Sequence, residues 1–303
     1  MDSAESESLK SQVRNFWNRQ SCDTNATAAK KHSPAYFEDI EAFRYYDQPF
    51  IHEFAQFTRY HGKRVIEVGF GAGTDFIQWL RAGARVTGID LTPEALENLT
   101  QRIHVYQLPP PENIRVADAE NLPFETNTFD LGYSFGVLHH SPNTEKAIAE
   151  LVRVVQPGGE IKIMVYNRHC IVAFKLWVKY ALLRGQPWKS LGWVMWHHLE
   201  SIGTKSYTRP ELKRIFEALP LTNIRIHSYV TAADYLAFSG FKPLNLLIRG
   251  VLLLGGNRPR WQRENYQTAA GQNPTGRSAP DAQTRFTGNR FGYFTCITAI
   301  KRA

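Results

Sequence analysis

Cysteine is scarce in this chain of 303 residues, which holds only Cys22, Cys170 and Cys296. An odd number of scattered thiols without metal-ligand spacing argues against a disulfide-stapled scaffold and against a cysteine-based zinc site. It fits a reducing compartment, and we therefore expect the protein in the cytoplasm.

Long apolar runs are also missing. The run 244–254 carries Arg249 near its middle and would cover roughly 16 Å as a helix, against a bilayer core of about 30 Å. Residues 1–8 are acidic and polar and no apolar run follows them, so we expect a frayed tail there and no secretory signal. We therefore expect no membrane-spanning helix, and peripheral membrane contact stays as an alternative.

Charge is unevenly distributed. Residues 1–60 and 61–170 are slightly acidic, whereas residues 171–303 hold 19 basic against 6 acidic residues and account for the net charge of +8. Such a segment favours an anionic acceptor or an anionic surface, although a solvated face that keeps the protein soluble explains it equally well. We do not expect nucleic acid as a partner, because the aromatic and arginine residues near 261 accompany no recognisable nucleic-acid module.

The segment 65–75, VIEVGFGAGTD, is the most informative in the chain. It reads as a buried strand, a glycine turn and the start of a helix. Gly71 and Gly73 let the backbone approach a ligand closely, and the helix N-terminus at Thr74 and Asp75 favours an anionic ligand end. An ordinary tight connection between a strand and a helix is the alternative.

Acidic or histidine side chains end the next three predicted strands. Asp90 ends the strand 85–90, where it can accept hydrogen bonds from both hydroxyls of a ribose or cap the following helix. Asp118 ends a third strand, where it suits an exocyclic amine of adenine or is a solvated loop acid. An apolar strand from Phe129 opens onto His139 and His140. We expect all these strand ends along one edge of a parallel sheet.

This ordered series, over roughly residues 60–170, resembles the class I S-adenosylmethionine-dependent methyltransferases, closest to the branch of the ubiquinone and menaquinone biosynthesis C-methyltransferases. The resemblance implies S-adenosyl-L-methionine as cofactor. Phe70 stands where many relatives carry a small or sulfur-containing residue. The cofactor-binding residues implied are Glu67, Gly69, Phe70, Gly71, Gly73, Asp90, Leu91, Asp118, Ala119 and Phe135.

The same resemblance implies an α/β fold: a doubly wound, seven-stranded Rossmann-like methyltransferase sheet whose last strand is antiparallel. The alternating segment 291–300 fits that last strand, which a dinucleotide oxidoreductase would not need. We expect a tail and helical cap over 1–60, the cofactor-binding core over 61–170, a basic aromatic insert over 171–207, and the rest of the core over 208–303 with a flexible insert at about 240–290. Thr208 and Glu211 predict a capping box at the start of a helix.

The acceptor is the least readable part. Methyl transfer from a sulfonium needs positioning for in-line attack and demands no metal. His139 or His140 is the best placed general base, although in the resembling family this histidine pair often belongs to the scaffold at the strand end. A zinc role for these histidines with His169 lacks a spaced partner set. Tyr166, Arg168 and Tyr45 are predicted acceptor contacts or packing residues.

Three functions follow from these alternatives. We expect transfer of a methyl group to an O, N or C nucleophile of a small acceptor that is anionic or partly hydrophobic. The second is a methyltransferase of a lipid or quinone at a membrane surface. The third is a non-catalytic cofactor-binding or nucleic-acid-binding protein.

Overall fold

The computed structural model describes residues 3–231, isolated positions between 233 and 250, and residues 285–303. Its centre is one eight-stranded sheet of order β3-β2-β1-β4-β5-β8-β6-β7. The antiparallel strand β8 lies between β5 and β6, as predicted for the last strand. The strands are β1 (Arg64–Val68), β2 (Arg85–Asp90), β3 (Asn113–Val116), β4 (Phe129–Phe135), β5 (Val155–Tyr166), β6 (Leu221–Tyr229), β7 (Arg285–Gly288) and β8 (Phe294–Lys301).

The short edge strand β7 was not expected. The sequence predicted a flexible segment up to about residue 290, but residues 285–288 pair in parallel with residues 225–228 of β6. Strand pairing is made by backbone N–H and C=O groups, which every residue except proline carries. The polar composition of this segment therefore could not predict the pairing. The other seven strands follow the predicted fold. The remainder of the predicted flexible insert, and most of the run 244–254, lie outside the described residues.

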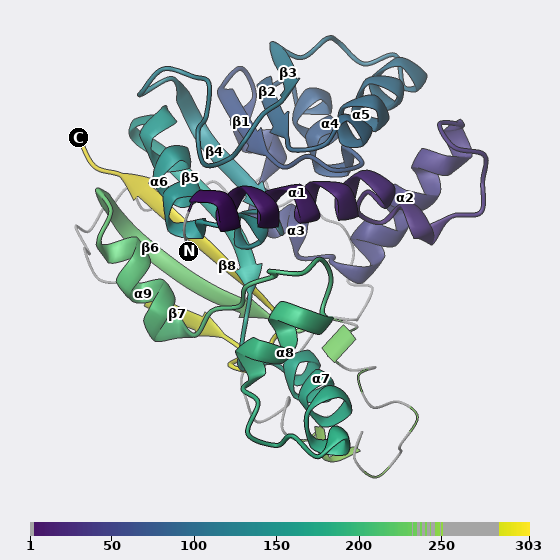
Figure 1. Ribbon diagram of the computed structural model, residues 1–303. Coiled ribbons are helices and arrows are strands. Elements are labelled where there is room, and N and C mark those ends of the chain that lie inside the picture. Colours follow the sequence, from purple (N-terminus) through teal and green to yellow (C-terminus); the bar gives the residue numbers. More distant parts are fainter. Residues whose placement is uncertain are drawn as a thin grey trace.

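Helices cover both faces of the sheet (Figure 1). One buried cluster joins the sheet to α3 and α4, and a second joins it to α6 and α9. At the start of α9, Thr208 and Glu211 form the predicted capping box. The helices are α1 (Ser3–Arg19), α2 (Pro34–Asp47), α3 (Ile51–Ala55), α4 (Thr74–Arg81), α5 (Pro93–Val105), α6 (Thr144–Val154), α7 (Ile171–Tyr180), α8 (Leu191–His198) and α9 (Arg209–Glu217).

The N-terminal segment corrects one prediction. Residues 3–8 belong to α1 and are not a frayed tail. Leu9 and Val13 are buried, and the Lys10 ammonium lies 2.6 Å from an oxygen of Asp118. Burial of Leu9 and Val13 and the ion pair of Lys10 anchor the helix. The polar composition of residues 1–8 does not reveal these contacts. Figure 1 shows α1 crossing in front of the sheet.

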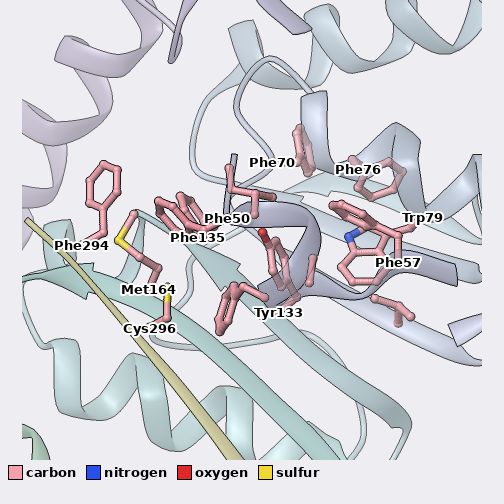
Figure 2. Packing of buried hydrophobic residues seen from close by; sticks show 14 of the residues in the cluster. Phe50, Phe57, Phe70, Phe76, Trp79, Tyr133, Phe135, Met164, Phe294 and Cys296 are labelled. Carbon is pink, nitrogen blue, oxygen red and sulfur yellow. The ribbon is translucent and has the colours of Figure 1, made fainter. Parts of the chain in front are cut away.

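Aromatic side chains pack behind the glycine turn (Figure 2). The Trp79 ring is fully buried, with ring centroids 4.4 Å from Phe57 and 5.2 Å from Tyr133. Its indole N–H donates a 2.9 Å hydrogen bond to Glu67 of β1. The core therefore fixes the first carboxylate of the glycine motif.

Candidate active site

One cavity lies at the carboxyl ends of the parallel strands, beneath α1. Its empty volume is about 1230 Å³, with solvent at the mouth included. Sheet order places the residues after β3, β2 and β1 at one end and those after β4 and on β5 at the other. We call these the cofactor end (Glu67, Gly71, Asp75, Asp90, Asp118) and the acceptor end (Trp17, His140, Tyr166, Glu200), and all nine residues line the cavity.

The three motif glycines share positive φ angles of 80°, 50° and 76° but have different roles. A Cβ on Gly69 would lie 2.3 Å from Val137, and one on Gly73 would lie 2.7 Å from Leu99. A Cβ on Gly71 would have no atom nearer than 3.5 Å, yet this glycine lines the cavity. Gly71 therefore provides close approach for a ligand, whereas Gly73, which does not line the cavity, allows the turn to pack on α5.

Asp90 holds the turn in place. One carboxylate oxygen accepts from the backbone N–H of Gly71 at 3.0 Å, and the other accepts from the N–H and hydroxyl of Thr92. Burial raises the pKa of Asp90. The oxygen that accepts from Gly71 has a second lone pair that can accept from a hydroxyl. Thr92 is the N-cap residue of α5, so the alternative that Asp90 caps this helix is wrong.

A buried ion pair closes the floor of the cofactor end. Arg44 of α2 donates to both oxygens of Asp75, at 3.0 and 2.9 Å, and Tyr133 donates to one at 2.7 Å. Burial alone would raise the pKa of Asp75, but the guanidinium and the hydroxyl donors lower it. Burial first, and then the charge of Asp75, raise the pKa of Glu67 well above its usual value. Sequence reasoning missed Arg44, because no local pattern links it to the glycine turn.

The predicted adenine contacts, Asp118 and Ala119, also line this end of the cavity. Asp118 bonds to Lys10, which sequence reasoning missed because 108 positions separate the two. Leu91, Gly69 and Phe70, which are predicted to bind the cofactor, also line the cavity, and Phe135 lies between the two ends at the carboxyl end of β4.

The acceptor end is built around His140, which is buried. Its Nδ1 lies 3.1 Å from the Ser201 hydroxyl and 3.2 Å from the Thr204 hydroxyl, and its Nε2 lies 3.4 Å from a carboxylate oxygen of Glu200. The Trp17 ring packs edge-on against the imidazole at 5.2 Å. The hydroxyls therefore fix the orientation of the ring, and its other nitrogen faces a carboxylate.

Glu200 ties the acceptor end together. Both of its oxygens lie 3.0 Å from the hydroxyl of Tyr166, which donates to the carboxylate. Sequence reasoning missed Glu200, although a signal existed: it is the one acidic residue between Arg168 and Arg209 in a strongly basic stretch.

One predicted general base and two predicted acceptor contacts do not line the cavity. His139 is fully buried behind His140, with its ring 4.1 Å from that of Tyr166, and burial lowers its pKa well below the usual value. Arg168 turns toward α9, where it binds Glu211 at 2.9 Å. Tyr45 donates to Asp75 at 3.2 Å and serves the ion pair beneath the cavity. Tertiary partners explain all three differences.

A group of potential metal ligands comprises His139, His140 and Glu200, whose ligand atoms lie within 4.8 Å of one another. His169, considered as the third zinc ligand from the sequence, is not in this group. Its backbone N–H donates to Asn167 at the end of β5.

Comparison with known proteins agrees with this geometry. Residues 66–163 match the model of a methyltransferase domain family. This segment, about a third of the chain, is thus similar to a methyltransferase domain. A phthiotriol/phenolphthiotriol dimycocerosates methyltransferase of Mycobacterium leprae is 38% identical over 112 residues, which cover 36% of this chain and 40% of that protein. A ubiquinone biosynthesis O-methyltransferase of Aromatoleum aromaticum is 32% identical over 109 residues, covering 36% and 46%. The chain thus matches less than half the length of either relative.

The domain also has the fold of solved methyltransferases. Geranyl diphosphate C-methyltransferase from Streptomyces coelicolor, solved with Mg²⁺, geranyl diphosphate and S-adenosyl-L-homocysteine, superposes with a TM-score of 0.56 at 13% identity. The superposition covers 97% of this chain and 98% of that one. It confirms the predicted class I methyltransferase fold.

The motifs predict S-adenosyl-L-methionine as the cofactor, and the residues present fit it. Gly71 has no side chain, so its backbone borders the cavity directly, beside the Asp90 carboxylate. The carboxylates of Glu67 and Asp118 line the same wall and offer acceptors for amine donors.

Proposed function

We propose that this protein transfers a methyl group from S-adenosyl-L-methionine to a hydroxyl of a partly hydrophobic, lipid-like or quinone-like acceptor. The observation that carries the proposal is the single cavity that joins the cofactor end to His140 and Glu200. Apolar side chains of Phe135, Met164 and Phe294, on β4, β5 and β8, also line the cavity. Such a lining suits an apolar acceptor, and the two relatives described above carry lipid and quinone names.

The cofactor residues bind and orient. Asp90 would accept from ribose hydroxyls, Asp118 from the adenine amine after exchanging its bond with Lys10, and Glu67 would face the methionine portion. The bound cofactor supplies an electrophilic methyl group on a sulfonium. Holding an acceptor oxygen in line with that methyl contributes on the order of 7–11 kcal/mol in well-oriented intramolecular models.

His140 moves the proton. Its Nε2 would take the proton of the acceptor hydroxyl while the oxygen lone pair forms the new bond to the methyl carbon and the carbon–sulfur pair returns to sulfur. Ser201 and Thr204 hold the ring through Nδ1, and the carboxylate of Glu200 stabilises the imidazolium that forms. His139 packs behind this pair as support.

Methyl transfer from labelled S-adenosyl-L-methionine to a panel of hydroxylated quinols and lipid alcohols tests the proposal. We expect transfer by the wild type and its loss in His140→Ala. The conservative control is Lys213→Ala, which removes an exposed cation on α9 and should leave transfer unchanged. Binding of S-adenosyl-L-homocysteine without transfer to any member of the panel would contradict the acceptor assignment.

A further inference from the structure

The chain makes an excursion between β5 and α9 that exposes apolar side chains. It consists of α7, a 3-10 turn at 182–184 and α8, and we call residues 171–198 the basic hairpin. Figure 1 shows α7 and α8 extending away from the sheet. Residues 182–188 at its tip are all exposed, and Leu183 and Trp188 have exposed fractions of 76% and 74%.

The same segment carries several cations. The basic hairpin contains Lys175, Lys179, Arg184 and Lys189 and no acidic residue. Within the described part of the chain, none of the four forms an ion pair with a carboxylate. Lys189 lies 4.2 Å above the ring of Trp193. Cations beside exposed leucine and tryptophan are the chemistry that anionic lipid headgroups and their acyl boundary attract.

The base of the basic hairpin lies at the acceptor end of the cavity. The excursion begins just after Tyr166 on β5 and returns at Glu200, and the hydroxyl of the one donates to the carboxylate of the other. Ile171 at the start of α7 is buried against Ile248. A surface on which the tip rests would therefore lie beyond the far end of α7 and α8, whose base adjoins the acceptor end.

We propose that the basic hairpin docks on an anionic lipid bilayer and so places the acceptor end at the source of an apolar acceptor. This proposal rests on the proposed function for its purpose, but docking itself requires no methyl transfer. No helix in the described part of the chain is long and apolar enough to cross a membrane, so the contact is peripheral. Exposed leucines favour a bilayer over nucleic acid, whose phosphates would use only the cations.

Co-sedimentation with vesicles tests the docking. We expect binding to phosphatidylcholine vesicles that contain phosphatidylglycerol, and much weaker binding to phosphatidylcholine alone. Lys179→Ala with Arg184→Ala should lower the partition coefficient about 25-fold, at roughly fivefold for each cation near the surface. Trp188→Ala should lower it about tenfold through lost apolar burial.

The matched control is Lys146→Ala with Lys213→Ala, which removes two exposed cations on α6 and α9. This control should change the partition coefficient less than twofold, because these two cations lie outside the basic hairpin and contribute only screened, long-range attraction. Equal loss in the control and the hairpin variants, or no vesicle binding by the wild type, would overturn the docking proposal. Retained affinity of each variant for S-adenosyl-L-homocysteine shows that it is folded.

The two proposals fail separately. Vesicle binding without methyl transfer to any acceptor would leave the docking intact and contradict the proposed function. Methyl transfer to a detergent-dispersed acceptor without vesicle binding would do the reverse. The protein could instead form a concentration-dependent dimer that Trp188→Ala abolishes, and show no vesicle binding. That result would mean that a second copy of the chain covers the basic hairpin, and it would overturn the proposal of bilayer docking.

Discussion

The two ends of the cavity are assembled in different ways. The cofactor end comes from the ends of consecutive strands, and a single motif from Glu67 to Asp75 supplies much of its wall. The acceptor end joins Trp17 of α1, His140 after β4 and Glu200 after α8, which lie far apart in the sequence. The cofactor end is thus built largely from one local motif, whereas the acceptor end depends on packing between segments far apart in the sequence.

The ends also differ in how their polar groups are held. At the cofactor end, Asp75 is buried and binds Arg44 in two places, and Asp90 accepts from backbone N–H groups. At the acceptor end, His140 has hydroxyl partners on one nitrogen and a 3.4 Å approach to Glu200 on the other. The cofactor end therefore holds its charges by fixed partners, and the acceptor end leaves one nitrogen able to exchange a proton.

The largest effect should come from removing that nitrogen. His140→Ala should lower kcat about 10² to 10⁴-fold, the usual contribution of a general base. Affinity for S-adenosyl-L-homocysteine should stay within about twofold, because His140 lies outside the cofactor end. Steady-state methyl transfer and calorimetric titration measure the two quantities. Parallel loss of rate and cofactor affinity would break the separation between the ends.

A pair of glycines tests where packing is tight. Gly73 and Gly185 have φ angles of 76° and 69°, but only Gly73 has an atom, Leu99 Cδ1 at 2.7 Å, where a Cβ would stand. Gly73→Ala should cost about 2–4 kcal/mol of unfolding free energy, and Gly185→Ala about 1 kcal/mol from the left-handed backbone alone. Urea unfolding of both variants gives the comparison, and equal costs would contradict the assigned role of Gly73.

Glu200→Gln tests the carboxylate of the acceptor end with little change in shape. Without its charge the imidazolium formed at His140 is less stable, so kcat should fall about tenfold, or roughly 1.4 kcal/mol. The KM for S-adenosyl-L-methionine and the Tm should stay unchanged, since the amide still accepts from Tyr166. A fall in Tm together with kcat would indicate a structural role instead.

The smallest effect concerns Lys162, which is buried on β5, the strand that carries Tyr166 at its end. Its ammonium donates to the Ala55 carbonyl at 2.8 Å and to Gln56, and burial lowers its pKa from 10.5 to about 7. Above pH 7 the unfolded chain keeps this proton and the folded chain loses it, so stability rises with pH. Between pH 7 and 8 the gain should be about 1 kcal/mol.

Unfolding free energies of the wild type and Lys162→Met across that range check the effect. The difference between the two curves should grow with pH in favour of the wild type. Parallel curves would show that Lys162 keeps its proton in the folded protein, with the Ala55 carbonyl and Gln56 as sufficient partners.

The contrast between the ends also explains what the sequence could predict. The turn at Gly71 and the strand-end carboxylates of Asp90 and Asp118 were predictable, because parallel strands bring their carboxyl ends to one edge. The capping box of Thr208 was predictable because its two residues are three positions apart.

The partners of these groups were not predictable. Lys10 and Arg44 reach their carboxylates across 108 and 31 positions. Arg168 follows the end of β5 at the expected edge, but its guanidinium binds the capping residue Glu211 of α9 and not the cavity. No periodicity or spacing reports such tertiary pairings, and the same reason hid Glu200 at the acceptor end.

The most direct test of the division between the ends is calorimetric titration of S-adenosyl-L-homocysteine into the wild type, Asp90→Ala and His140→Ala. We predict binding to the wild type, weakening of about tenfold or more in Asp90→Ala from the loss of a charged acceptor, and unchanged affinity in His140→Ala. Absence of binding to the wild type, or equal weakening in both variants, would contradict the account.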